Sequence, residues 1–160
     1  MRAISSPESP ARRPIWVDAA PFRAHVRHAM AVADVPWPAV AVAAGVSVPA
    51  VRALLSGRAG RPQTRIEPRL AARLLRVDAR ELTAMRVARV PSALTAERLR
   101  QLLADGVDPL RMARWCQIGP DELTALVDGD AGSCARLTEA LVLAAERLRE
   151  ADPQQPGVAA

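Results

Sequence analysis

The sequence contains no lysine, no asparagine and no tyrosine, and all 22 of its basic residues are arginine. A GC-rich coding bias produces such a composition, so the positions of the arginines carry more information than their number. Aromatic residues are limited to Trp16, Phe22, Trp37 and Trp115. Any core of this 160-residue chain must therefore be built mainly from alanine, valine and leucine.

Long apolar runs and metal-binding patterns are also missing. No stretch approaches the roughly 18 apolar residues of a membrane span, and prolines and charges stand where a signal peptide needs its apolar segment. We therefore expect a cytoplasmic, nucleoid-associated protein with no membrane contact. Cys116 and Cys134 are expected to be reduced thiols and are too few for a zinc site. His25 and His28 have no nearby carboxylate or cysteine, so we expect no metal and no cofactor.

Charge is distributed unevenly along the chain. Residues 16–92 carry twelve arginines and five acidic residues, whereas residues 93–160 carry seven arginines and eleven acidic residues. Residues 1–15 contribute +2 to the total net charge of +5. Attraction for phosphate is therefore expected in the first half of the chain.

The pattern predicts an all-α fold of two small helix-turn-helix domains in tandem, offset by 72 residues. The N-terminal domain is predicted over residues 15–90 and the C-terminal domain over residues 91–150. Disordered tails are predicted at residues 1–14 and 151–160, which lack periodicity. Within the second domain, Thr95 is expected to cap a helix and residues 133–150 to form the last one. No segment alternates apolar and polar residues for long enough to predict a strand.

A helix-turn-helix motif is predicted over residues 37–56. Such a motif needs a small residue where its helices touch, a turn residue that tolerates positive φ, and apolar residues that anchor the second helix. The residues that meet these needs are Ala41, Gly45, Val46, Val51 and Leu54. Their spacing is that of the repressor-type DNA-binding motif, so residues 48–56 are predicted to be a recognition helix in the major groove.

The outward positions of this helix are the first candidate DNA contacts. They are Ser47, Val48, Pro49, Arg52, Ala53 and Ser56, together with Trp37 at the start of the preceding helix. Arg52 is the one strong base reader, because its guanidinium can pair with guanine O6 and N7. A phosphate-facing or solvated arginine is the alternative at this position. Val48 and Ala53 offer only apolar contact to a thymine methyl, so direct readout of bases is thin.

The connection after this helix, residues 58–65, supplies the second candidate set. Its members are Arg58, Arg61, Gln63, Thr64 and Arg65, with no acidic residue among them. Gly60-Arg61-Pro62 is similar to the core of an AT-hook, whose extended backbone threads an arginine into the minor groove, although Ala59 stands where an AT-hook has arginine. A loop that grips phosphates and a plain solvated loop are the alternatives.

A second copy of the motif is predicted over residues 109–128. It keeps Ala113, Ile118, Leu123 and Leu126 at the framework positions, but Gln117 replaces the turn glycine. Three acidic residues, Asp121, Glu122 and Asp128, lie on its second helix, where phosphates would repel them. Three roles are compatible with this copy: protein contact or homodimerisation through residues 91–150, weaker DNA contact through Arg111 and Arg114, or stabilisation alone.

Four segments together resemble a family of small tandem helix-turn-helix proteins of actinobacteria and their phages. They are Trp16-Val17-Asp18-Ala19, Leu54-Leu55-Ser56-Gly57, Gly60-Arg61-Pro62 and Ala71-Ala72-Arg73-Leu74-Leu75, and the resemblance covers about residues 16–128. It implies a repressor-like regulator of transcription that binds double-stranded DNA and has no enzymatic domain. With its acidic residues, the second helix of the second copy differs from an ordinary DNA-reading helix.

Catalytic signatures are lacking in the sequence. There is no serine-histidine-acid pattern and no glycine-rich phosphate loop, so we expect no enzyme and no catalytic residues. The predicted function is sequence-specific binding of double-stranded DNA in transcription regulation. The alternative is a protein-interaction adaptor, such as an antitoxin-like protein or a transcription-complex subunit, in which the motif serves as scaffold.

Overall fold

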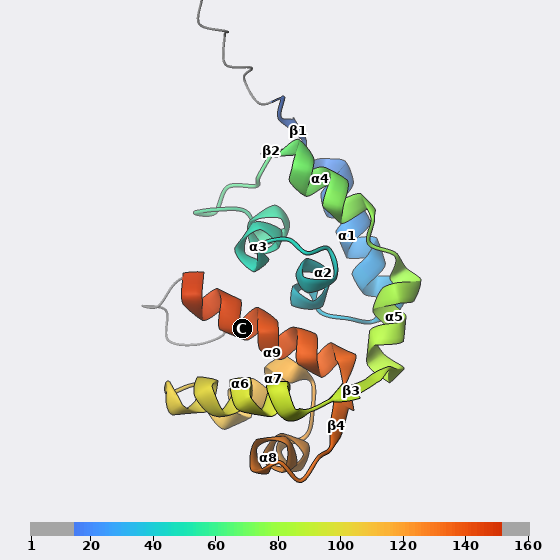
Figure 1. The fold of residues 1–160 in the computed structure, drawn as a ribbon. Helices are drawn as coiled ribbons and strands as arrows, with labels where there is room; N and C mark the ends of the chain where they lie inside the picture. The colour runs from blue at the N-terminus through green and yellow to red at the C-terminus, as the bar shows by residue number, and fades with distance from the viewer. Residues whose placement is uncertain (1–14, 152–160) are drawn as a thin grey trace, which may run out of the picture.

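The computed structural model describes residues 15–151, so the predicted tails lie outside it, except that Ala151 ends the last helix. The all-α fold class is confirmed: nine helices and four short strands make up this part of the chain (Figure 1). In chain order they are β1 (Val17–Asp18), α1 (Ala20–Ala33), α2 (Trp37–Ala43), α3 (Val48–Ser56), β2 (Arg65–Ile66), α4 (Pro68–Leu75), α5 (Ala79–Val87), β3 (Arg89–Pro91), α6 (Ala93–Ala104), α7 (Pro109–Cys116), α8 (Pro120–Asp128), β4 (Ser133–Ala135) and α9 (Arg136–Ala151).

The backbone repeats itself at the predicted offset. Helix α8 occupies the range of α3 shifted by 72 residues. One hydrogen bond closes the turn before each helix: the Val46 amide donates to the Ala41 carbonyl at 3.0 Å, and the Ile118 amide donates to the Ala113 carbonyl at 3.1 Å. The two predicted motifs therefore have the same backbone plan.

Left-handed residues also recur in register. The pairs are Asp34 and Gly106 (φ 52° and 89°), Gly45 and Gln117 (63° and 56°), and Gly57 and Gly129 (80° and 85°). Gln117 therefore adopts a conformation that glycine takes without steric cost and that disfavours residues with a Cβ atom.

The chain repeats its plan in a first unit, β1 to α5, and a second unit, β3 to α9. The strands, which the sequence did not predict, join the start of each unit to the segment after its third helix. Val17 pairs with Ile66 between β1 and β2, and Val90 pairs with Cys134 between β3 and β4, both antiparallel. Segments of two or three residues are too short to show an alternating pattern. Residues 133–135 therefore form a strand where the sequence predicted the start of the last helix.

Helix α9 joins the two units. It packs against α6 and α7 of its own unit and against α2, α3 and α5 of the first unit (Figure 1). Buried residues of both units accordingly belong to one hydrophobic core. The predicted boundary at residue 90 does not separate two cores, and β3 crosses it.

The start of α6 differs from the prediction. The helix begins two residues before Thr95, which is only 1% exposed. Its hydroxyl accepts a contact from the Cys134 thiol at 3.8 Å. Thr95 is therefore an interior residue and not a helix cap.

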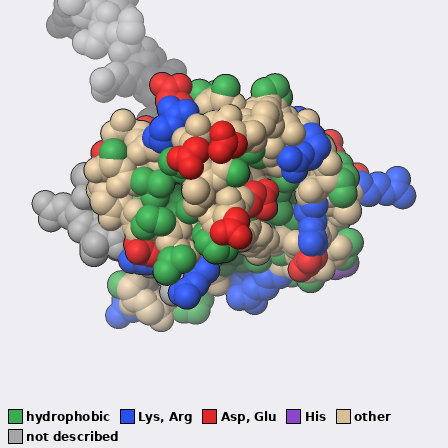
Figure 2. Space-filling view, turned by 90° about the horizontal axis from the view of Figure 1, so that it is seen from below, with side chains coloured by type: hydrophobic (Ala, Val, Ile, Leu, Met, Phe, Trp, Pro, Cys, Tyr) green, Lys and Arg blue, Asp and Glu red, His purple; other side chains and the backbone are tan. Residues whose placement is uncertain are grey.

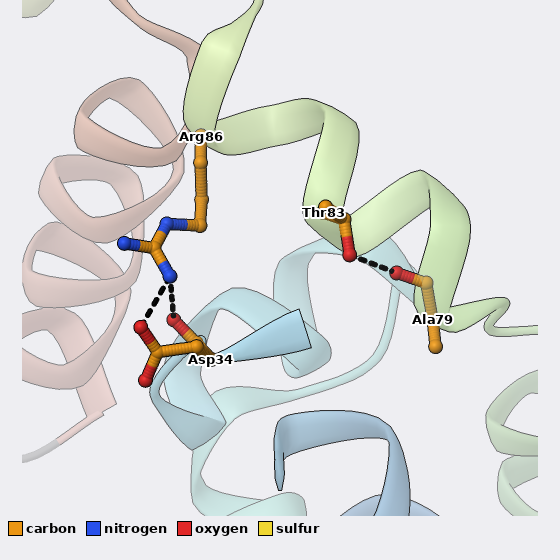
Figure 3. Close-up of polar contacts among 4 residues, drawn as sticks. All are labelled: Asp34, Ala79, Thr83 and Arg86. Carbon is orange, nitrogen blue, oxygen red and sulfur yellow. Dashed lines mark hydrogen bonds and ion pairs between the residues drawn. The ribbon is translucent and has the colours of Figure 1, made fainter. Parts of the chain in front are cut away.

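An ion pair between Arg86 and Asp34 joins α5 to the end of α1 within the first unit (Figure 3). Arg86 of α5 donates to the carbonyl of Asp34 at 3.1 Å and also to the Asp34 carboxylate, so α5 is fastened to the end of α1. Within α5, the Thr83 hydroxyl donates to the Ala79 carbonyl at 2.8 Å. The Arg86 guanidinium is thus bound to Asp34 within the fold.

No helix among residues 15–151 has the length and apolar character needed to cross a bilayer.

Candidate nucleic-acid interface

Helix α3 exposes a narrower surface than the sequence predicted. Ser47, Arg52 and Ser56 are exposed and Pro49 is half-buried, but Val48 is 0% and Ala53 4% exposed. The prediction that Val48 and Ala53 point outward is therefore wrong. It treated the motif in isolation, whereas α3 is packed by α9 of the second unit as well as by α2.

Arg52 and Ala50 lie on different sides of α3. Ala50 is the residue of this helix that lines a cleft with the arginines after α3. Successive residues of a helix are rotated by about 100°, so Arg52 is about 160° around the axis from Ala50. Pro49 and Ser56 share its side of the helix. Arg52 and the arginines of residues 58–65 therefore do not form one cationic face, because the arginines after α3 line a cleft together with Ala50.

Residues 58–61 form a tight turn. The amides and carbonyls of Arg58 and Arg61 bond reciprocally at 3.0 Å, and the two residues between them, Ala59 and Gly60, have φ values of 48° and 74°. Positive φ at both central positions is the type I′ geometry that joins antiparallel segments. The Gly60-Arg61-Pro62 backbone is therefore folded into a turn, and the similarity to an extended AT-hook does not extend to its conformation.

The segment after the turn is held by helix α1. Arg23 donates from Nε to the Leu54 carbonyl at 2.8 Å and from its terminal nitrogen to the Gln63 carbonyl. The Ala19 amide donates to the Thr64 carbonyl at 2.9 Å, and the Gln63 side chain donates to the Arg65 carbonyl at 3.0 Å. Residues 58–65, here called the arginine turn, are therefore fixed to the fold.

The arginine turn and helix α4 line a groove along the N-terminal half of α3 that consists of two adjoining clefts with shared lining residues. One end is lined by Trp16 and the arginine turn, the other by the Gly45 turn and α4, and Ala50, Glu67 and Leu70 belong to both ends. We call this the α3–α4 groove. Its charged residues are Arg58, Arg61, Arg65, Glu67, Arg69, Arg73 and Arg76. Six arginines and one carboxylate therefore line the groove.

These six arginines have no carboxylate partner within residues 15–151. Arg73 donates to the Gly45 carbonyl, which ties α4 to the turn of the motif. Some arginines outside the groove do pair with acids: Arg98 lies 3.2 Å from Glu146, and Arg149 lies 3.8 Å from Asp105. Unpaired guanidinium groups gathered along one groove create a positive field that attracts anions.

Sequence reasoning missed the contribution of α4. Arg69, Arg73 and Arg76 follow one another at spacings of four and three, which places them on one helix face. That spacing was visible in the sequence and could have identified them. Trp16 lines the other end of the groove, and the sequence distinguishes it only as one of four aromatic residues and as part of the family resemblance.

Trp37 does not lie among the groove residues. It is half-buried and packs edge-to-face on Trp115, with ring centroids 6.2 Å apart and an interplanar angle of 88°. The Trp115 indole donates to the Leu141 carbonyl of α9 at 2.8 Å. The structure therefore gives Trp37 a packing role between the two units, where the sequence predicted a DNA contact.

The second unit presents different chemistry. Asp121, Glu122 and Asp128 are exposed on α8, and acidic and hydrophobic side chains meet near the middle of the face seen from that end of the molecule (Figure 2). Arg111 and Arg114 are exposed on α7 and do not line the α3–α4 groove. The arginine-lined groove and the acidic helix α8 therefore belong to different units.

No family model, curated protein or solved structure was found to match the chain. Among residues 15–151, no three potential metal-ligating side chains lie close enough to hold an ion.

Proposed function

We propose that the protein binds double-stranded DNA through the α3–α4 groove and helix α3. The observation that carries this proposal is the set of six arginines that line one groove without carboxylate partners. Such groups gain energy by neutralising phosphates, because condensed counterions are released from the DNA when they do so.

The width of α3 suits a duplex. A helix with its side chains is about 10–12 Å across and the major groove is about 12 Å wide, so each flank of an inserted helix faces one DNA strand. The α3–α4 groove then follows the phosphates of one strand. Arg52, on the opposite flank, faces base edges or the other strand.

Base reading in this arrangement depends mainly on Arg52. Val48 and Ala53 are buried, so they make no contact with thymine methyl groups. Ser47 and Ser56 are exposed and hydrogen-bond bases of more than one kind. We therefore propose affinity dominated by phosphates, modest sequence preference, and a regulatory role in transcription.

Removal of groove charge tests the proposal. The variant with Arg58, Arg61 and Arg65 all changed to Ser should lose binding to a labelled duplex by at least about a hundredfold at low salt. A matched control changes three other arginines to Ser: Arg80, Arg136 and Arg147. They are exposed outside the groove and have no carboxylate partner among residues 15–151. An equal loss in both variants would show that net charge, and not the groove, attracts DNA.

The adaptor alternative is favoured by one observation, the exposed acidic residues of α8 at the position that α3 holds in the first unit. An adaptor binds its partner without retaining DNA. Absence of duplex binding by the wild-type chain at low salt would select this alternative.

A further inference from the structure

Trp16 is the most exposed aromatic residue of the chain. Half of its surface is accessible, whereas Trp37 and Trp115 pack on each other and Phe22 packs on the core. Its position is fixed by the strand pair that follows it: Val17 lies opposite Ile66, which places Trp16 beside Glu67 at the groove. An exposed indole in a fixed position is a ready surface for a planar ligand.

The cleft around Trp16 combines a net positive charge, three arginines against the one carboxylate of Glu67, with apolar surface. Arg58, Arg61 and Arg65 provide positive charge, while Pro62 and Leu70 provide apolar walls to the same cleft of about 690 Å³. A nucleotide has both parts, a planar base and an anionic phosphate. Stacking of bases on aromatic side chains inside a positively charged groove is the usual mode by which proteins hold unpaired nucleotides.

Bases within a duplex are stacked and paired, so an indole reaches their faces only after they leave the stack. We propose that the Trp16 end of the groove binds an unpaired nucleotide adjoining the duplex held by α3, with its base on the indole and its phosphate on the arginine turn. This inference rests on the proposed function. It makes DNA with a single-stranded extension a better partner than blunt duplex.

Two probes test the inference: a blunt labelled duplex of about 20 base pairs, and the same duplex with about four unpaired thymidines at either the 3′ or the 5′ end. We expect one extension to raise wild-type affinity by about tenfold, as stacking of a base contributes. Trp16→Ala should abolish the difference in affinity between the extended and the blunt duplex. Trp16→Phe should keep most of the gain, and Leu110→Ala, at an exposed apolar residue of α7, should keep all of it.

Tryptophan emission gives a second readout. Binding of the extended duplex should quench the Trp16 component, which is the emission that Trp16→Phe lacks, and leave that of the Trp37–Trp115 pair unchanged. Blunt duplex should cause little quenching. No gain from either extension, or equal weakening of both probes by Trp16→Ala, would overturn the inference while leaving duplex binding in place. Failure of the wild type to bind any probe would overturn both proposals.

Discussion

A Cβ atom at Gly57 would lie 2.2 Å from the carbonyl oxygen of Arg61. Gly57 has a φ of 80° and ends α3, so the close approach brings the arginine turn back against the helix. The position of the three arginines in the turn therefore depends on a residue without a side chain.

Gly57→Ala should displace the arginine turn and weaken DNA binding. The matched control is Gly60→Ala, which has a similar φ of 74° but open space around the new Cβ atom. We expect Gly60→Ala to lower the free energy of unfolding by about 1 kcal/mol and Gly57→Ala to lower it by more. Denaturant unfolding and duplex titration measure both effects. Equal stability loss in the two variants would contradict a steric role for the approach.

Arg69 and Arg76 test the part of the groove that only the structure identified. Changing both to Ala should weaken binding of all duplexes similarly, because phosphate contacts carry no sequence information. The slope of log K against log salt should become shallower by about 2. Arg80→Ala, an exposed change outside the groove, should leave the slope unaltered. If the double variant keeps the full slope, α4 is not part of the DNA interface.

Gln117→Gly should stabilise the protein. Gln117 has a φ of 56°, and its counterpart in the first unit, Gly45, is a glycine at 63°. Relief of left-handed strain exceeds the entropy cost of a new glycine, so we expect a gain of about 0.5–1 kcal/mol. The reverse change, Gly45→Gln, should be destabilising. A loss of stability in Gln117→Gly would show that side-chain contacts of Gln117 outweigh its backbone strain.

Alkaline pH should destabilise the protein through its cysteines. Burial raises the pKa of Cys116 to about 12, with the neighbouring Cys134 as a smaller cause, and burial also raises the pKa of Cys134. A raised pKa means that the folded state favours the neutral thiol. The resulting stabilisation is complete below the unfolded pKa of 9.0 and is lost as pH rises from there towards about 12.

The composition makes this effect measurable. The chain has neither lysine nor tyrosine, so few other groups titrate between these pH values. The free energy of unfolding should fall between pH 9 and 11 in the wild type, and it should fall much less in the variant with Cys116→Ala and Cys134→Ala. An equal decline in both proteins would assign the pH dependence to other groups.

The motif was predictable because its determinants are local. Ala41 and Gly45 occupy the contact and turn that their spacing indicated, and the offset to Ala113 and Gln117 holds in the backbone hydrogen bonds. The periodicity of single segments was also sufficient to predict the fold class.

The errors arise from contacts between distant segments. Val48 is buried in a core shared with α9, a helix about 90 residues farther along the chain, and Trp37 packs on Trp115. No pattern within the motif reports such packing. The groove also escaped sequence reasoning, because it forms only when α4 folds back beside the turn of the motif.

The salt dependence of duplex binding by the wild-type chain tests the central claim most directly. If all six groove arginines meet phosphates, log K should fall with log salt at a slope of about −5. No binding at low salt, or a slope shallower than about −2, would contradict a DNA interface in the α3–α4 groove.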